Sequence, residues 1–179
     1  MKNLSIVFFI SMLFLISCES SSTENKVSEQ DIESIIADLK TVNTLDKEKI
    51  NTFITSVDNF VVSNPKSEKA PNYLELKAKY ITALGKHNEA IKVYDNIYQN
   101  YENYKNYSDA LFMKAFIYEN NLNNKAEAEL HYQKYLNEFP NGVFAKDAQF
   151  SLDNMNKTPE ELMEMFKKMN EEAEKTTAQ

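Results

Sequence analysis

The chain has 179 residues, which is enough for one domain or for one short array of repeats with a sizeable core. With 42% hydrophobic and 26% charged residues, it is neither a disordered chain nor a protein that crosses a membrane several times. Only two Gly and four Pro occur, which argues against β-sandwiches, β-barrels and glycine-rich phosphate loops, and favours long helices.

Charge and side-chain chemistry exclude further classes of function. The net charge is −7 and all twenty basic residues are Lys, so we expect no nucleic-acid partner. A single Cys excludes an internal disulfide framework, and two His leave little for a metal centre. The sequence holds no Gly-flanked Ser, His-Glu-x-x-His motif or P-loop. We therefore expect no catalytic residue, no metal and no cofactor.

Residues 1–17 have the pattern of a signal peptide. Lys2 precedes an apolar run of thirteen residues, 4–16, which is shorter than the roughly 20 residues that a membrane-spanning helix needs. The run is followed by Ser17 and by Cys18, which is the only Cys of the chain. Residues 18–27 are polar and predict a flexible tether.

The sequence Leu15-Ile16-Ser17-Cys18 resembles the lipobox of bacterial lipoproteins. This resemblance implies cleavage between Ser17 and Cys18, diacylglycerol on the Cys18 sulfur, and often a fatty acid such as palmitate on the new amine. Two or three acyl chains hold a protein stably on a membrane. An ordinary secretory signal with an incidental Cys, or an uncleaved anchor, is the alternative. Glu19 in place of the Asp that retains lipoproteins in the inner membrane favours the outer membrane, with the protein facing the periplasm.

The next segment, 28–65, predicts a first pair of helices. Ser28 and Asp31 have the spacing of a capping box, and Asp46 is the expected N-cap of the second helix. Apolar residues follow at helical spacing in both halves, and Asn64-Pro65 ends the pair.

Six more helices are expected downstream. Residues 71–142 predict four of them, with turns at 85–88 and 120–125. The N-cap of the fifth helix is expected at Ser108 or Asp109, and Pro140 is expected to end the sixth helix. Residues 143–176 predict a seventh helix over 143–155 and an eighth helix that opens at Thr158.

A fixed offset relates the helix pairs. Ala90 and Tyr94 lie 38 residues before Ala128 and Tyr132, and matching apolar residues in the preceding pair lie 37 residues earlier. Small residues let helices approach each other closely, and the aromatic side chains fill the space beside them. The expected packing residues are Ala78, Ala90, Tyr94, Ala115, Tyr118, Ala128, Tyr132 and Pro140.

In these residues the chain resembles the tetratricopeptide repeat, although its period of 37–38 residues exceeds the usual 34. The resemblance implies an all-α solenoid of about three and a half antiparallel helix pairs, with the first pair divergent. It also predicts a C-terminal helix that caps the solenoid. The run from Phe139 to Phe150 further resembles a repeat junction of outer-membrane-assembly lipoproteins of the BamD type.

In the repeat family, the first helices of the pairs line a concave groove that binds peptides. The matching positions here are Asn72, Glu75, Lys79, Thr82, Phe112, Phe116, Glu119 and Gln149. Phe112 and Phe116 share one helical face and would suit an apolar peptide, or would instead pack against the next helix. Glu75 stands where the family's carboxylate clamp usually has Lys, and Lys79 stands where it usually has Asn, so we expect no clamp.

Four tyrosines recur every three residues at positions 98, 101, 104 and 107. They predict either rings that close the seam between repeats, which we favour, or a platform for a sugar or a peptide. Together these features predict a non-catalytic, lipid-anchored adaptor that binds a protein or peptide partner at the periplasmic side of an envelope membrane. A structural subunit of an outer-membrane assembly or cell-wall complex is the alternative, and a surface glycan binder is a third.

Overall fold

The computed structural model describes residues 27–41 and 46–177, and side-chain burial up to residue 175. Residues 1–26, with the predicted cleavage site at Ser17 and Cys18, lie outside the described residues. The described residues form eight helices and no strand, so the predicted all-α class is confirmed. Their bounds are α1 Glu29–Lys40, α2 Lys47–Ser63, α3 Ala70–Ala83, α4 His87–Asn100, α5 Tyr107–Asn120, α6 Lys125–Glu138, α7 Ala145–Asn154 and α8 Pro159–Thr177.

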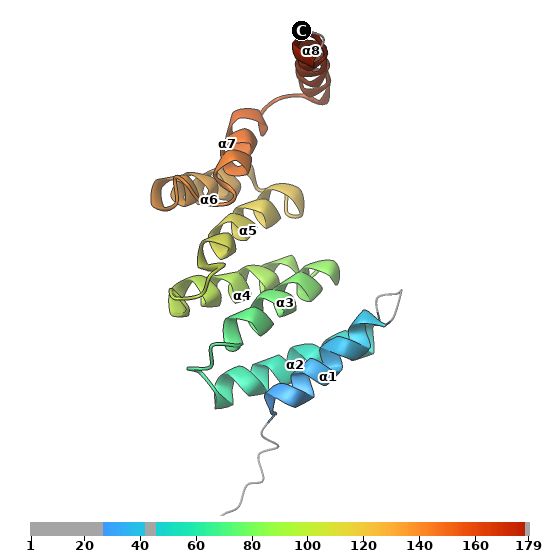
Figure 1. Ribbon diagram of the computed structural model, residues 1–179, viewed down its shortest axis with the longest axis vertical. Helices are drawn as coiled ribbons and strands as arrows, with labels where there is room; N and C mark the ends of the chain where they lie inside the picture. Colours follow the sequence, from blue (N-terminus) through green and yellow to red (C-terminus); the bar gives the residue numbers. More distant parts are fainter. Residues whose placement is uncertain (1–26, 42–45, 178–179) are drawn as a thin grey trace, which may run out of the picture.

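The helices are arranged as a solenoid of stacked pairs (Figure 1). Short connections join α1 to α2, α3 to α4, and α5 to α6 as hairpins, and α2 packs on α3 while α4 packs on α5. α7 follows α6 as half of a further pair. Each hairpin leaves one apolar side for its neighbour to cover, which is why the pairs stack.

Local capping explains where several helices begin. The Ser28 side chain accepts a hydrogen bond from the Asp31 amide at 3.2 Å, and the Asp31 carboxylate accepts one from the Ser28 amide at 2.8 Å. Asp46 accepts from the first-turn amides of α2, and Thr158 and Glu161 form a reciprocal box at the start of α8. These bonds satisfy amides that have no partner within a helix, so the three predicted caps are confirmed.

The start of α5 differs from the prediction. The helix begins at Tyr107, directly after Asn106, and no side chain caps its first turn. Ser108 lies inside the helix, and its hydroxyl donates to the Asp109 carboxylate at 3.2 Å. The prediction of a cap at Ser108 or Asp109 is therefore wrong, because the backbone of the preceding connection sets this boundary.

Six of the eight predicted packing residues are buried in the core, and Tyr118 and Pro140 are not. Ala78, Ala90, Ala115 and Ala128 are completely buried, as is Tyr132, and Tyr94 is 1% exposed. Tyr118 is only half-buried, and its ring stacks on His131 at 5.5 Å between centroids. Pro140 is exposed directly after the end of α6, where it stops the helix without entering the core.

The three connections between pairs, 64–70, 101–107 and 139–145, share one backbone pattern. In each, the fourth amide donates to the first carbonyl and the seventh amide to the fourth carbonyl, at 2.9–3.1 Å. The offsets of 37 and 38 residues are therefore a repeat of backbone geometry as well as of side chains.

A repeated ion pair joins successive pairs. The buried Lys77 of α3 donates to Asp58 of α2, and Lys114 of α5, also buried, donates to Asp95 of α4, 37 residues further on. Each Lys lies in the first helix of one pair, and its side chain extends to the second helix of the preceding pair. The sequence reasoning missed these pairs, although the equal spacing of the two Lys and the two Asp was visible.

The predicted capping role of α8 is not met in the described residues. None of the α8 residues whose burial is described is buried, and Met163 is 69% and Met169 53% exposed. The helix lies beyond the end of α7 and contacts it through Phe150 and Phe166, whose ring centroids are 6.3 Å apart (Figure 1). α7 has 10 residues where α3 to α6 each have 14, so it offers about one turn less surface to cover.

Among the described helices, none combines the length and apolar character that crossing a membrane requires.

Candidate functional site

The predicted groove residues of α3 lie on one helix but differ in exposure. Asn72 and Lys79 are exposed, whereas Glu75 and Thr82 are half-buried. The Thr82 hydroxyl donates to the Ala78 carbonyl of its own helix at 2.8 Å, so it is already engaged. Of the four, Asn72 and Lys79 are the side chains most open to a partner.

Glu75 is the centre of a polar cluster. Its carboxylate accepts hydrogen bonds from the Tyr104 hydroxyl at 2.5 Å, from the Asn106 amide at 2.9 Å and from the Lys79 ammonium at 2.5 Å. Burial raises the pKa of Glu75, but these three donors outweigh it and hold the pKa below its usual range. Glu75 is therefore an ionised carboxylate that positions Tyr104, and it is not a free contact for a ligand.

Phe112 is not a groove residue. Its ring is 6% exposed and stacks on Phe144 at 4.4 Å with an interplanar angle of 8°, and it also contacts Tyr132 and Tyr135. The alternative, that it packs against its neighbours, is the one observed. Phe116 lies one turn further along α5 and is 41% exposed, so it keeps its predicted place on the surface.

The two remaining predicted groove residues, Glu119 and Gln149, form hydrogen bonds with other residues of the protein. Glu119 accepts a hydrogen bond from the Tyr132 hydroxyl at 2.7 Å, and therefore helps to satisfy a buried tyrosine. Gln149 of α7 is exposed, with its amide donating to Asp153 at 2.8 Å. The structure thus leaves Asn72, Lys79, Phe116 and Gln149 exposed along the successive first helices.

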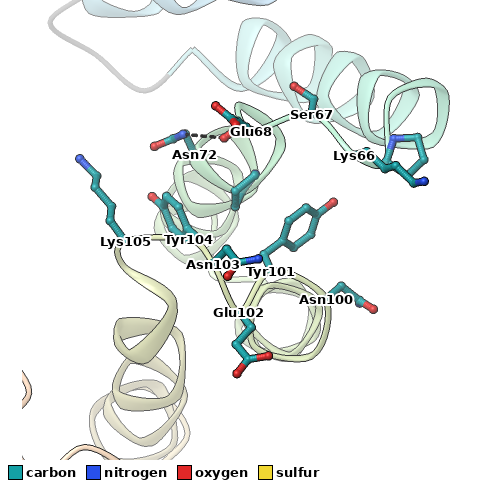
Figure 2. A pocket seen from close by; sticks show the side chains of 12 residues that line it. Lys66, Ser67, Glu68, Asn72, Asn100, Tyr101, Glu102, Asn103, Tyr104 and Lys105 are labelled. Carbon is teal, nitrogen blue, oxygen red and sulfur yellow. Dashed lines mark hydrogen bonds between the residues drawn. The ribbon is translucent and has the colours of Figure 1, made fainter.

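A cleft of about 720 Å³ opens beside this face, between the α2–α3 and α4–α5 connections. Its lining joins aromatic, amide, charged and proline side chains, and comprises Pro65, Lys66, Ser67, Glu68, Pro71, Asn72, Asn100, Tyr101, Glu102, Asn103, Tyr104 and Lys105. In Figure 2, Tyr101 and Tyr104 point from the α4–α5 connection toward the α2–α3 connection, on the sides of Lys66 and Asn72 respectively. The cleft therefore meets the predicted groove at Asn72.

The structure divides the four tyrosines of the repeated run into two roles. Tyr98 and Tyr107 stack at 5.1 Å, and Tyr107 meets Phe139 edge-on at 5.8 Å, so these rings close the seam as predicted. Tyr101 and Tyr104 instead line the cleft. The spacing of three residues could not separate the two roles, because the run leaves α4 after Asn100 and continues through bends.

The described residues contain no group of three His, Cys, Asp or Glu side chains that could hold a metal ion. His131 stacks on Tyr118, and burial lowers its pKa, with the nearby Lys114 acting in the same direction. This is the environment of a packing residue.

Stacked helix pairs with an exposed face along their first helices define a helical-repeat solenoid. Residues 109–142, which span nearly all of α5 and all of α6, match the family described as tetratricopeptide repeat. Such repeats are typically non-catalytic modules of protein–protein interaction, and the fold is a solenoid of this type. A comparison with curated proteins found no match.

Proposed function

We propose that this protein is a lipid-anchored, non-catalytic adaptor that binds a protein or peptide partner at the periplasmic side of a bacterial envelope membrane. The observation that carries the proposal is the match to a protein-binding repeat, embedded in a solenoid whose first helices keep Asn72, Lys79 and Phe116 exposed. The likeness of 139–150 to junctions of BamD-type lipoproteins supports the envelope setting, and the proposal takes no activity from that family.

Crosslinking in intact cells tests the adaptor role. The full chain, crosslinked and purified, should yield partner proteins whose adducts map to α3, α5 and α7. Adducts confined to the outward-facing helices α2, α4 and α6 would contradict this function.

The anchor is tested separately, with an alkyne fatty acid that labels lipoproteins in growing cells. The wild-type chain should take up the label and sediment with membranes, and Cys18→Ala should lose both properties. Density-gradient separation then assigns the protein to the outer or the inner membrane. A labelled Cys18→Ala chain, or an unlabelled wild-type chain, would overturn lipidation at this residue.

Exposed apolar residues on α8 support a second candidate function, which we propose as the alternative: a structural subunit in an outer-membrane or cell-wall complex. Three large apolar residues of α8 at the end of the solenoid are exposed, namely Met163, Phe166 and Met169. Such a surface is typical of a contact with another subunit. A stoichiometric membrane complex that is lost when these three residues are changed to Ser would favour this role over an exchanging adaptor.

A further inference from the structure

The cleft between the α2–α3 and α4–α5 connections is lined by aromatic rings and by hydrogen-bonding side chains, which are the groups that a peptide-binding site needs. We propose that it binds a short, proline-containing segment of the partner in the polyproline II conformation. This inference rests on the proposed function, because it names the kind of segment that a protein partner would offer. It concerns the edge of the solenoid, where the cleft adjoins the groove along the first helices at Asn72.

The lining supplies what a polyproline II segment needs. Such a segment forms no internal hydrogen bonds, so its carbonyls require donors, and its ring faces pack on aromatic side chains. Tyr101 and Tyr104 supply two aromatic rings. Among the described residues, the Tyr101 hydroxyl and the Asn103 amide make no hydrogen bond with the rest of the protein, so both are free to donate to a bound carbonyl.

Contacts within the protein hold both tyrosines of the site in place. Tyr104 donates to Glu75 at 2.5 Å, and the Asn106 amide bonds to both the Glu75 carboxylate at 2.9 Å and the Tyr104 hydroxyl at 3.2 Å. Tyr101 is half-buried against the core cluster that α1 to α5 form. Fixed rings lose little conformational entropy on binding, and a rigid, extended ligand loses little as well.

A comparison of two seams explains why the cleft lies here. Phe139 occupies in the third connection the place that Tyr101 has in the second, and Tyr107 packs on the Phe139 ring. The residue 37 positions before Tyr107 is Ala70, which has only a methyl group. The Tyr101 ring therefore lacks the aromatic cover that Phe139 receives, and a ligand ring can take that place.

The mixed charge of the cleft agrees with a largely uncharged ligand. Lys66 and Lys105 lie on its wall together with Glu68 and Glu102, and none of the four belongs to an ion pair among the described residues. Neither a strongly acidic nor a strongly basic peptide would be preferred by this balance. A protein recognises a proline-rich segment through the faces of the proline rings and through the backbone carbonyls, and not through charge.

The test uses the full chain in detergent micelles and a fluorescent oligoproline peptide as probe. Anisotropy should show saturable binding, with no binding of a Gly-Ser peptide of equal length. Tyr101→Ala should weaken binding by at least about fivefold. Asn103→Ala, at an exposed position, should weaken it by at least about twofold. Leu130→Ala on α6, which truncates an exposed side chain outside both the cleft and the concave face, is the matched control and should leave affinity unchanged.

Circular dichroism checks that each variant is folded. If Tyr101→Ala unfolds, Tyr101→Phe and Asn103→Ala decide the question, because both keep the packing of the ring. Absence of saturable oligoproline binding would overturn the inference, and so would equal binding of the Gly-Ser peptide. Displacement by a chito-oligosaccharide would assign the cleft to glycans. Partner crosslinks that persist unchanged in Tyr101→Ala and Asn103→Ala would remove this site while leaving the adaptor role intact.

Discussion

Gly142 lies where the α6–α7 connection passes close to Tyr135. A Cβ atom at this position would be 2.3 Å from the Tyr135 hydroxyl oxygen and 3.1 Å from the Phe139 Cβ. The hydroxyl is held in place because it accepts the Phe144 amide at 3.0 Å. Gly142→Ala should therefore lower the free energy of unfolding by about 1–3 kcal/mol in urea denaturation.

A double-mutant cycle separates this clash from backbone effects. Tyr135→Phe removes the oxygen that the added methyl would meet, so Gly142→Ala should cost less in that background. Gly85→Ala is the control, because Gly85 has a φ of +78° and nothing within 4 Å of its added Cβ. Its cost of about 1–2 kcal/mol should be the same in the wild-type chain and in the Tyr135→Phe variant. Strict additivity of Gly142→Ala and Tyr135→Phe would contradict the proposed contact.

The free energy of unfolding should depend on pH because of His131. Burial lowers its pKa in the folded state, Lys114 lowers it further, and Glu127, at 3.7 Å, only partly opposes them. The unfolded chain therefore binds a proton at higher pH than the folded chain, and stability should fall as the pH drops below about 6.5. The urea midpoint, measured at about pH 7.5 and 5.5, should change less in His131→Phe than in the wild type. An equal change in both proteins would show that His131 contributes nothing.

The Lys114–Asp95 pair should stabilise the seam between the second and third helix pairs. Asp95→Ala leaves the buried Lys114 ammonium without its partner, so we expect a loss of about 1–3 kcal/mol in the free energy of unfolding. The double variant Lys114→Met/Asp95→Ala should recover part of that loss, because no buried charge remains. A double variant less stable than Asp95→Ala would count against this explanation.

Residue patterns alone predicted some of these environments and not others. Ala78 and Ala115 were identified as core positions because a small side chain at a helix crossing has few other uses. Phe112 and Phe116 could not be told apart, since both lie on one helical face. The rings that cover Phe112 come from other elements, Phe144 from the next connection and Tyr132 and Tyr135 from α6, and these contacts separate the buried ring from the exposed one.

At the scale of whole helices, α8 is the element whose contribution differs most from expectation. Its described residues are half-buried or exposed, so it adds little to the core. Deleting residues 157–179 should change the free energy of unfolding of the remaining chain by less than about 0.5 kcal/mol. A loss of several kcal/mol would show that α8 caps the solenoid after all. Urea denaturation followed by tyrosine fluorescence measures the difference.

Helix boundaries were predictable where local bonds set them. The caps at Ser28, Asp46 and Thr158 involve residues two or three positions away, so the sequence contains the whole motif. The start of α5 depends on the backbone bonds of the connection 101–107, and α8 contacts α7 through the ring pair Phe150–Phe166, whose members are 16 residues apart. Neither the start of α5 nor the position of α8 can be predicted from residues that are close in sequence.

The solenoid as a whole follows from the repeat. An offset of 37–38 residues predicted the stacked pairs, because a recurring apolar pattern requires a recurring neighbour. The cleft could not be predicted in this way, since it arises where Ala70 takes the position that Tyr107 has one repeat later. A binding site at a departure from the repeat is visible only in three dimensions.

The central claim is that this solenoid holds a protein partner through its concave face and the adjoining cleft. Site-specific photo-crosslinking in cells tests it most directly, with benzoylphenylalanine introduced in turn at Asn103, at Phe116 and, as a control on α6, at the exposed Leu130. We expect a discrete protein adduct from Asn103 and Phe116 and none from Leu130. Adducts from Leu130 alone, or none from any of the three, would contradict it.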